Sequence, residues 1–291
     1  MPFEAFIYNG ASTPNRLYAM LCLIAKQGEM ARSQIIQLMQ PESIAANQVM
    51  ATDIFRTLEL LGFIEASSNR NRSAQLAIDI DLLDSVETFR NVLQERVGGV
   101  ATEEADHFIL NQFAAWYAIQ DNGVFSMSRS DYEAKFHEQL YPGIEKRLVT
   151  SAQSIPAWTS WAEFVGWGWQ LRSGQQETTL IPDCTIRLRP LLGELLPETD
   201  AILFGVFMER LAARCPELDG GALFERCWEA SRPYERRGNR LSLMLSTALR
   251  VLHQQGEIAL EDRADATDNW TLFPAQSYIA RATHIRREVN P

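Results

Sequence analysis

Two stretches near opposite ends of the chain repeat one hydrophobic pattern in one register. In each, a helical stripe of apolar residues runs to a glycine, and two short apolar runs follow, separated by a polar tip. The glycines, Gly62 and Gly256, lie 194 residues apart, and the same offset relates five further apolar pairs. These pairs are Phe55 and Leu249, Leu58 and Leu252, Ile64 and Ile258, Leu76 and Trp270, and Ile78 and Leu272. Six matches without a gap indicate two copies of one module.

The order of elements around each glycine predicts a winged helix-turn-helix. In the first copy we expect helices at about 14–28, 33–39 and 47–61, then a hairpin of 63–66 with 76–78. In the second we expect helices at 201–215 and 223–230, a third ending at Gly256, and a hairpin of 258–260 with 270–273. In such folds the third helix enters the major groove of DNA.

The predicted fold class is therefore mainly α with small β-hairpin wings, as two winged helix-turn-helix domains flanking a helical middle. The expected domains are an N-terminal winged helix at 1–80, a mostly helical middle domain at 81–200, a C-terminal winged helix at 201–275 and a basic tail at 276–291. We expect the tail to be a short helix or partly disordered. The middle contains a tryptophan-rich segment in which Trp158, Trp161 and Val165 share a helical face. That face favours core packing, with a protein interface or base stacking as alternatives.

The first module offers candidate DNA contacts on its third helix and at its wing tip. They are Asn47, Gln48, Thr52 and Arg56 on the helix, with Asn69, Arg70, Asn71 and Arg72 at the tip. A compact cationic tip suits phosphates or a minor-groove edge. A solvated turn is the alternative interpretation, because Asn and Ser favour turns in any case.

The second module has its basic residues before the third helix. Arg232, Arg236, Arg237 and Arg240 form the densest basic cluster of the chain, beside a helix N-terminus that would favour phosphate. Its wing is acidic, with Glu261, Asp262, Asp265 and Asp268. This copy can therefore contact DNA through its turn or a protein through its wing, and both alternatives stay open.

Charge restricts any DNA contact to a local patch. The chain has 27 Lys and Arg against 37 Asp and Glu, a net charge of −10, whereas nucleic-acid-binding domains are usually basic. The basic residues are nearly all arginine, which suits phosphates and guanine edges. A compositional bias of the genome is the alternative explanation.

Catalysis, cofactors and metals have no motif to support them. The chain lacks G-x-G-x-x-G after a strand, a P-loop, H-E-x-x-H and G-x-S-x-G. Its four cysteines are scattered without a C-x-x-C pair, which predicts buried thiols in a reducing cytoplasm and no zinc. We expect structural roles for His107 and His137, and neither a secretion signal nor a membrane span. The prediction is a cytoplasmic protein that is not an enzyme.

Three segments resemble the DpdG family. They are the start Thr13-Pro14-Asn15-Arg16, the first winged module, and the stretch from Gly166-Trp-Gly-Trp-Gln-Leu171 to Ile181-Pro182-Asp183-Cys184-Thr185. DpdG proteins belong to bacterial gene clusters that place 7-deazaguanine derivatives in DNA and restrict foreign DNA. The resemblance implies a non-catalytic accessory subunit of an anti-phage modification and restriction system. Its partners would be double-stranded DNA and other subunits of a defence complex, such as an ATPase or a nuclease.

The alternative is a protein-interaction scaffold. The chain is also similar in architecture to the tandem winged-helix partners of SMC-type ATPases, which bind protein subunits. In those proteins the two modules lie closer together, and the spacer of about 120 residues here counts against that likeness.

Overall fold

The computed structural model describes residues 12–28, 30–44, 47–65, 73–99, 108–145, 148–150, 152–171, 179–266, 268–276 and 278–288. The α-helices are α1 (Pro14–Gln27), α2 (Arg32–Met39), α3 (Val49–Leu60), α4 (Val86–Val97), α5 (Phe108–Ile119), α6 (Arg129–Leu140), α7 (Ser154–Val165), α8 (Thr185–Leu188), α9 (Leu192–Leu195), α10 (Phe204–Arg214), α11 (Ala222–Ser231) and α12 (Leu243–Gln254). Short 3-10 helices are η2 (Ile80–Leu83), η3 (Asp121–Ser126) and η4 (Arg189–Leu191). The strands are β1 (Gly168–Leu171), β2 (Thr179–Pro182), β3 (Ile202–Leu203), β4 (Ile258–Glu261), β5 (Trp270–Thr271), β6 (Arg281–Ala282) and β7 (His284–Arg287). The predicted class, mainly helical with small strands, is confirmed.

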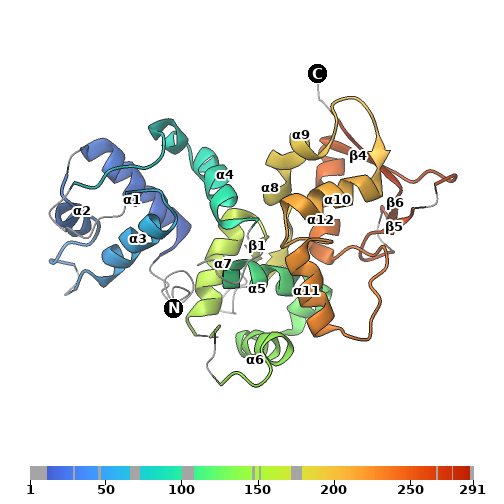
Figure 1. The fold of residues 1–291 in the computed structure, drawn as a ribbon, viewed down its shortest axis with the longest axis horizontal. Coiled ribbons are helices and arrows are strands. Elements are labelled where there is room, and N and C mark those ends of the chain that lie inside the picture. Colours follow the sequence, from blue (N-terminus) through green and yellow to red (C-terminus); the bar gives the residue numbers. More distant parts are fainter. Residues whose placement is uncertain are drawn as a thin grey trace.

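Helices α1, α2 and α3 form a unit at one end of the molecule, with α10 to α12 at the other end (Figure 1). Pro14 lies in the first turn of α1, where a missing N–H costs no hydrogen bond, and Gly28 follows its last turn. After α3 the chain returns alongside itself, with Ile64 opposite Leu76 and Ala31 opposite Ser73, both antiparallel. The order of the three helices is the predicted one, and the expected hairpin of 63–66 with 76–78 is represented among the described residues by isolated bridges alone.

Aromatic and guanidinium contacts attach this unit to the middle of the molecule. The Phe89 ring of α4 lies 5.2 Å from the Tyr18 ring and 5.5 Å from the Phe63 ring. Arg96 of α4 stacks on Phe63, 4.6 Å from its centroid, and donates a hydrogen bond to the Leu61 carbonyl. These contacts hold α3 in a defined orientation relative to α4.

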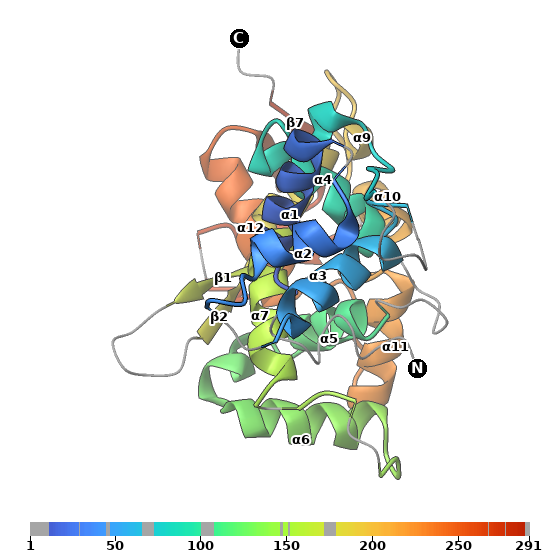
Figure 2. The ribbon, with the colours of Figure 1, turned by 90° about the vertical axis from the view of Figure 1, so that its left-hand side faces the viewer.

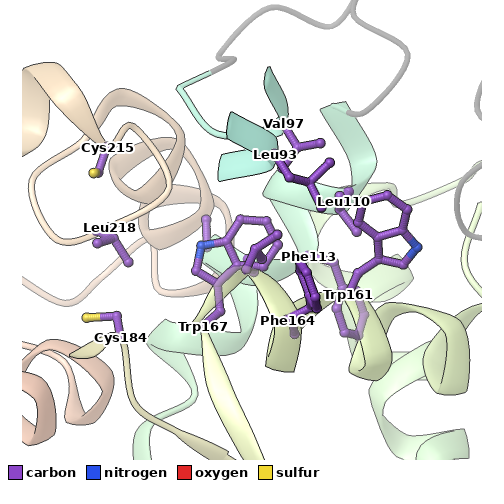
Figure 3. Close-up of a cluster of buried hydrophobic side chains, with 14 of the residues drawn as sticks. Leu93, Val97, Leu110, Phe113, Trp161, Phe164, Trp167, Cys184, Cys215 and Leu218 are labelled. Carbon is purple, nitrogen blue, oxygen red and sulfur yellow. The ribbon is translucent and has the colours of Figure 1, made fainter. Parts of the chain in front are cut away.

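The middle of the chain is built around a fully enclosed helix. All twelve residues of α5 are buried, because it has no polar face and packs against α11 and α12. Trp158 is buried with its ring 4.6 Å from that of Phe113 of α5. Trp161 and Trp167 are buried in the same core (Figure 3), so core packing is the role of these tryptophans. Trp169, on β1, is the exception, with 45% of its surface exposed.

The repeated glycines end their helices in the same way. Gly62 has φ of 65° and Gly256 has φ of 70°, the left-handed conformation that glycine adopts at low cost. The residue after each glycine donates to the carbonyl five positions earlier: Phe63 N to Leu58 O at 2.9 Å, and Glu257 N to Leu252 O at 3.0 Å. This pairing satisfies the last carbonyls of α3 and of α12. The two copies therefore share the helix, the glycine and the start of the following strand.

The second predicted hairpin is wrong. β4 does not pair with residues 270–273 but with β7, in the register Ile258 with Arg287 and Glu261 with His284. Residues 270–271 form β5, which pairs with β6. β7 pairs with both β3 and β4, so it is the central strand of a three-stranded sheet. Its side chain Ile285 is buried in the core.

The expectation of a helical or partly disordered tail is also wrong over residues 281–288. They contribute β6 and β7, and Ala282 and Ile285 are completely buried. Arg281 and Arg286, which made this segment look like a solvated tail, are exposed directly beside the buried Ala282 and Ile285, because successive side chains of a strand point to opposite faces. Because α11 packs on α5, and α12 on α8 and β2, the C-terminal elements share a core with the middle of the chain across the expected boundary near residue 200.

Candidate nucleic-acid interface

Helix α3 has one buried face and one face open to solvent. Ala51, Ile54, Phe55 and Leu58 are buried against the rest of the unit. The open face is formed by Val49, Thr52 and Arg56, spaced three and four residues apart, so that they line one side of the helix. In Figure 2 the viewer faces α2 and α3 directly, with the rest of the molecule behind them.

The turn that leads into α3 is fixed by one side chain. Gln40 donates through Nε2 to the Asn47 carbonyl at 2.7 Å and accepts from the Ala51 N–H at 3.0 Å. Asn47 is exposed and Gln48, the residue before the first turn of α3, is half-buried. The four helix residues predicted from the sequence are therefore brought together on α3 and at its N-terminal end.

Arg56 is a solvent-facing cation on this face. It is exposed and forms no ion pair with any residue that the structure describes. Its neighbour Arg32 is different, because it pairs with Glu59 at 2.9 Å and lies over the Phe55 ring. Asp53, on the same side of α3 as Arg56, is half-buried. The predicted wing-tip residues, Asn69, Arg70, Asn71 and Arg72, lie outside the described residues.

Three of the four arginines before α12 are held by carboxylates of the protein itself. Arg240 lies 2.7 Å from Asp121, which also lies 4.0 Å from Arg232. Arg237, only 9% exposed, contacts Asp219 at 3.6 Å and also pairs with Glu225. Arg236 is exposed and has no ion pair among the described residues. Most of the charge of Arg232, Arg237 and Arg240 is therefore neutralised within the protein.

The N-terminus of α12 is occupied by the same carboxylates. Asp219 accepts hydrogen bonds from the Ser242 N–H at 2.7 Å and from its hydroxyl at 2.6 Å, and Asp121 accepts from the Leu243 N–H at 2.9 Å. These groups take the place that a phosphate would have at a helix N-terminus. Along α12, whose residues are all described, Gln254 is the single exposed one, so the open face of α3 has no counterpart on this helix.

Asp121 is the side chain beside the arginine cluster that the sequence did not single out. It has φ of 51°, the one non-glycine residue with positive φ among those described. Burial raises the pKa of its carboxyl, while the Leu243 N–H, Arg240 and Arg232 lower it in part. The run Asp121-Asn122-Gly123 was a signal, because Asp and Asn before glycine favour turns with positive φ. The sequence did not show which arginines this carboxylate would meet.

Arg56 and Arg250 occupy equivalent positions of the two copies, 194 residues apart, but they differ in their contacts. Arg250 of α12 donates to the carbonyls of Phe273 at 2.6 Å, Pro274 at 3.1 Å and Ile279 at 2.8 Å. Burial lowers the pKa of its guanidinium. Arg250 therefore connects α12 to neighbouring backbone, whereas Arg56 is an exposed cation on α3.

Other chemistry is limited in the part of the chain that the structure describes. No group of three or more His, Cys, Asp or Glu is placed to hold a metal ion there. Burial raises the pKa of Cys215 and Cys227 to about 12, and raises that of Cys184 as well. His137 accepts at Nε2 from the Leu148 N–H at 2.8 Å, a structural contact. Within the described ranges, no helix has the length and apolar character needed to span a membrane.

The fold and this surface define a mainly helical protein with a three-helix unit that presents one arginine-bearing helix face to solvent. The sequence profile of the DpdG-like family matches residues 5–266 of the 291 residues. The chain belongs to the DpdG-like family, which confirms the resemblance found in the sequence. No curated protein and no solved structure matches the chain.

Proposed function

We propose that this chain is a non-catalytic, duplex-DNA-binding accessory subunit of a bacterial system that modifies DNA and restricts foreign DNA. Membership of the DpdG-like family supports a role in the Dpd modification system. DNA would be bound by the N-terminal unit, with α3 in the major groove. The other subunits of the system would be its protein partners.

The proposed winged-helix arrangement of this unit has three supports. The helices follow in the order α1, α2 and α3, and the chain then returns alongside itself through isolated β-bridges. The chain turns back at Gly62, after which Ile64 faces Leu76. The residue before α2, Ala31, faces Ser73 in a second isolated antiparallel bridge. Together these features are typical of a helix-turn-helix followed by a β-ribbon.

The observation that carries the DNA-binding proposal is the contrast between α3 and α12. α3 has an open face with the exposed Arg56, whereas every residue of α12 except Gln254 is buried or half-buried and its N-terminus is filled by Asp121 and Asp219. The distribution of charge also favours DNA binding by the N-terminal unit. Residues 1–80 hold six Lys and Arg and seven Asp and Glu, so this region is nearly neutral in a chain of net charge −10. DNA would meet least repulsion there.

The direct test is charge reversal on α3, with a matched reversal elsewhere. We expect Arg56→Glu to weaken binding of the complete chain to duplex DNA by about tenfold, because a contact to a base edge or a phosphate is replaced by a repelled carboxylate. Fluorescence anisotropy at fixed salt measures this change. Lys135→Glu is the control, since Lys135 is exposed on α6, away from α3 in both views (Figure 1, Figure 2). Equal loss in the two variants would contradict a specific role for α3.

The non-catalytic part of the proposal is supported by the state of the thiols. A buried thiol with a pKa near 12 has almost no thiolate at neutral pH, so Cys215 and Cys227 are poor nucleophiles. His137, fixed between Leu148 and the Glu133 carbonyl, has both ring nitrogens engaged. A subunit that positions DNA for a separate enzyme needs neither group.

A second candidate, a protein-interaction scaffold, is favoured by the C-terminal half. Three of the four arginines before α12 are neutralised, and Asp262, Asp265 and Asp268 give this half an acidic edge, whereas Glu261 is paired with Arg263 and Arg286. Tyr234, on the connection between α11 and α12, is almost fully exposed, and exposed tyrosines often anchor protein interfaces. Co-purification with an ATPase or a nuclease, with no DNA shift by the chain alone, would favour this candidate over DNA binding.

A further inference from the structure

We propose that the open face of α3 recognises thymine through its C5-methyl group, using the side chains of Val49 and Thr52. The inference rests on the DNA-binding role proposed above and names what that same face reads. Two observations carry it: where the Thr52 hydroxyl is engaged, and how far Val49 is exposed.

Thr52 has already used its hydroxyl. Its Oγ1 donates to the Gln48 carbonyl one turn earlier, at 2.8 Å. A threonine bonded back to its own helix has its one proton engaged, so it cannot donate to a ligand, although its oxygen can still accept. The residue is exposed, so it offers a ligand over α3 its methyl group beside an acceptor oxygen.

Val49 adds apolar surface one turn before Thr52. It is 55% exposed, and it is the first residue of α3. A single exposed valine is ordinary on a protein surface. Here it lies in line with Thr52 and Arg56, on a turn fixed by the two hydrogen bonds of Gln40. Both β-branched side chains are restricted at χ1, so little rotamer freedom is lost when they bind.

This order of groups matches the major-groove edges of neighbouring base pairs. Among the four standard bases only thymine has a C5-methyl group, and apolar side chains read it by contact. Val49 and Thr52 are about 4.5 Å apart along the helix axis, close to the base-pair spacing of about 3.4 Å. Arg56 lies about one turn further and can reach a guanine edge or a phosphate. The proposed recognition surface on α3 therefore consists of the methyl groups of Val49 and Thr52, followed by the guanidinium of Arg56.

The test is a pair of duplexes that differ in the methyl group alone. The complete chain is titrated with an alternating dA–dT duplex and with the same duplex containing deoxyuridine in place of thymidine, at one salt concentration. We expect binding to the deoxyuridine duplex to be weaker by about fourfold for each methyl group that is buried. The variant Val49→Ala/Thr52→Ser removes methyl groups from both side chains and keeps the hydroxyl of position 52. It should bind the two duplexes equally.

The outcomes separate this inference from the function on which it rests. Equal affinity of the unchanged chain for the two duplexes would overturn the thymine inference and leave DNA binding intact. A preference for thymidine that persists in the double variant would also overturn it, because the preference would then come from DNA shape. Failure to bind either duplex would contradict the proposed function itself, and the inference with it.

Discussion

At the scale of single residues, the two copies of the repeat show how one side chain is given two roles. Arg56 and Arg250 are equivalent in sequence, and each directly follows a buried residue of its helix, Phe55 in α3 and Leu249 in α12. Arg250 donates to the carbonyls of Phe273, Pro274 and Ile279. Arg56 stays in solvent. The neighbouring chain, rather than the helix, decides which arginine is available to a ligand.

This contrast predicts different effects of one substitution at the two positions. Arg250→Gln should lower the free energy of unfolding by about 2 kcal/mol or more, since charge-assisted hydrogen bonds to several carbonyls are lost. Arg56→Gln should change it by less than about 0.5 kcal/mol, as exposed positions usually do. Urea denaturation followed by circular dichroism measures both values. A comparable loss in the two variants would mean that Arg56 is also held within the fold.

A second prediction at this scale concerns the buried pair of Arg187 and Glu217, which are 1% and 0% exposed and 3.0 Å apart. Glu217→Gln should cost about 3–5 kcal/mol of stability, because it leaves an uncompensated charge in the core. The matched control is the surface pair of Arg189 and Glu257, where Glu257→Gln should cost less than about 1 kcal/mol. Chemical denaturation of the two variants would refute the account if their losses were similar.

At the scale of elements, the sequence predicts helices well and strand partners poorly. The stripes before Gly62 and Gly256 locate α3 and α12, because the helical period and the glycine stop are local signals. The partner of β4 is not a local property. Residues 270–271 and 284–287 are both short and each contains one large apolar side chain, Trp270 or Ile285, and the packing of Ile285 in the core selects β7. The candidate site also combines local and non-local features. The sequence predicts the residues on α3, which are a local feature. It does not predict that α12 packs against α5 and α8, because those contacts join distant parts of the chain.

The central position of β7 gives a prediction about truncation. A chain that ends after Ala280 lacks β6 and β7 and leaves the edges of β3, β4 and β5 unpaired, with an open cavity where Ala282 and Ile285 pack. We expect it to lose cooperative thermal unfolding, while a chain that ends after Glu288 unfolds as the complete chain does. Circular dichroism on heating distinguishes the two. If the shorter chain kept a cooperative transition within a few degrees of the complete chain, the role assigned to β7 would be contradicted.

At the scale of the whole molecule, the position of the α1 to α3 unit and the distribution of charge both favour DNA binding at the N-terminal end. The unit of α1 to α3 lies at one extremity (Figure 1), and residues 1–80 are nearly neutral, while the remainder contains 30 of the 37 acidic residues. An acidic body repels the phosphate backbone, so bound DNA would lie across the N-terminal end and away from the C-terminal half. The arginines near α12 do not change this expectation, because Asp121, Asp219 and Glu225 neutralise most of their charge.

The most direct test of this claim is photo-crosslinking of the complete chain to duplex DNA from two exposed positions. A photoreactive phenylalanine derivative replaces Thr52 on α3 in one variant and Tyr234, on the connection between α11 and α12, in the other. The account predicts crosslinks to DNA from position 52 and none above background from position 234. Crosslinks from position 234 without any from position 52 would contradict it, because DNA would then lie on the C-terminal half.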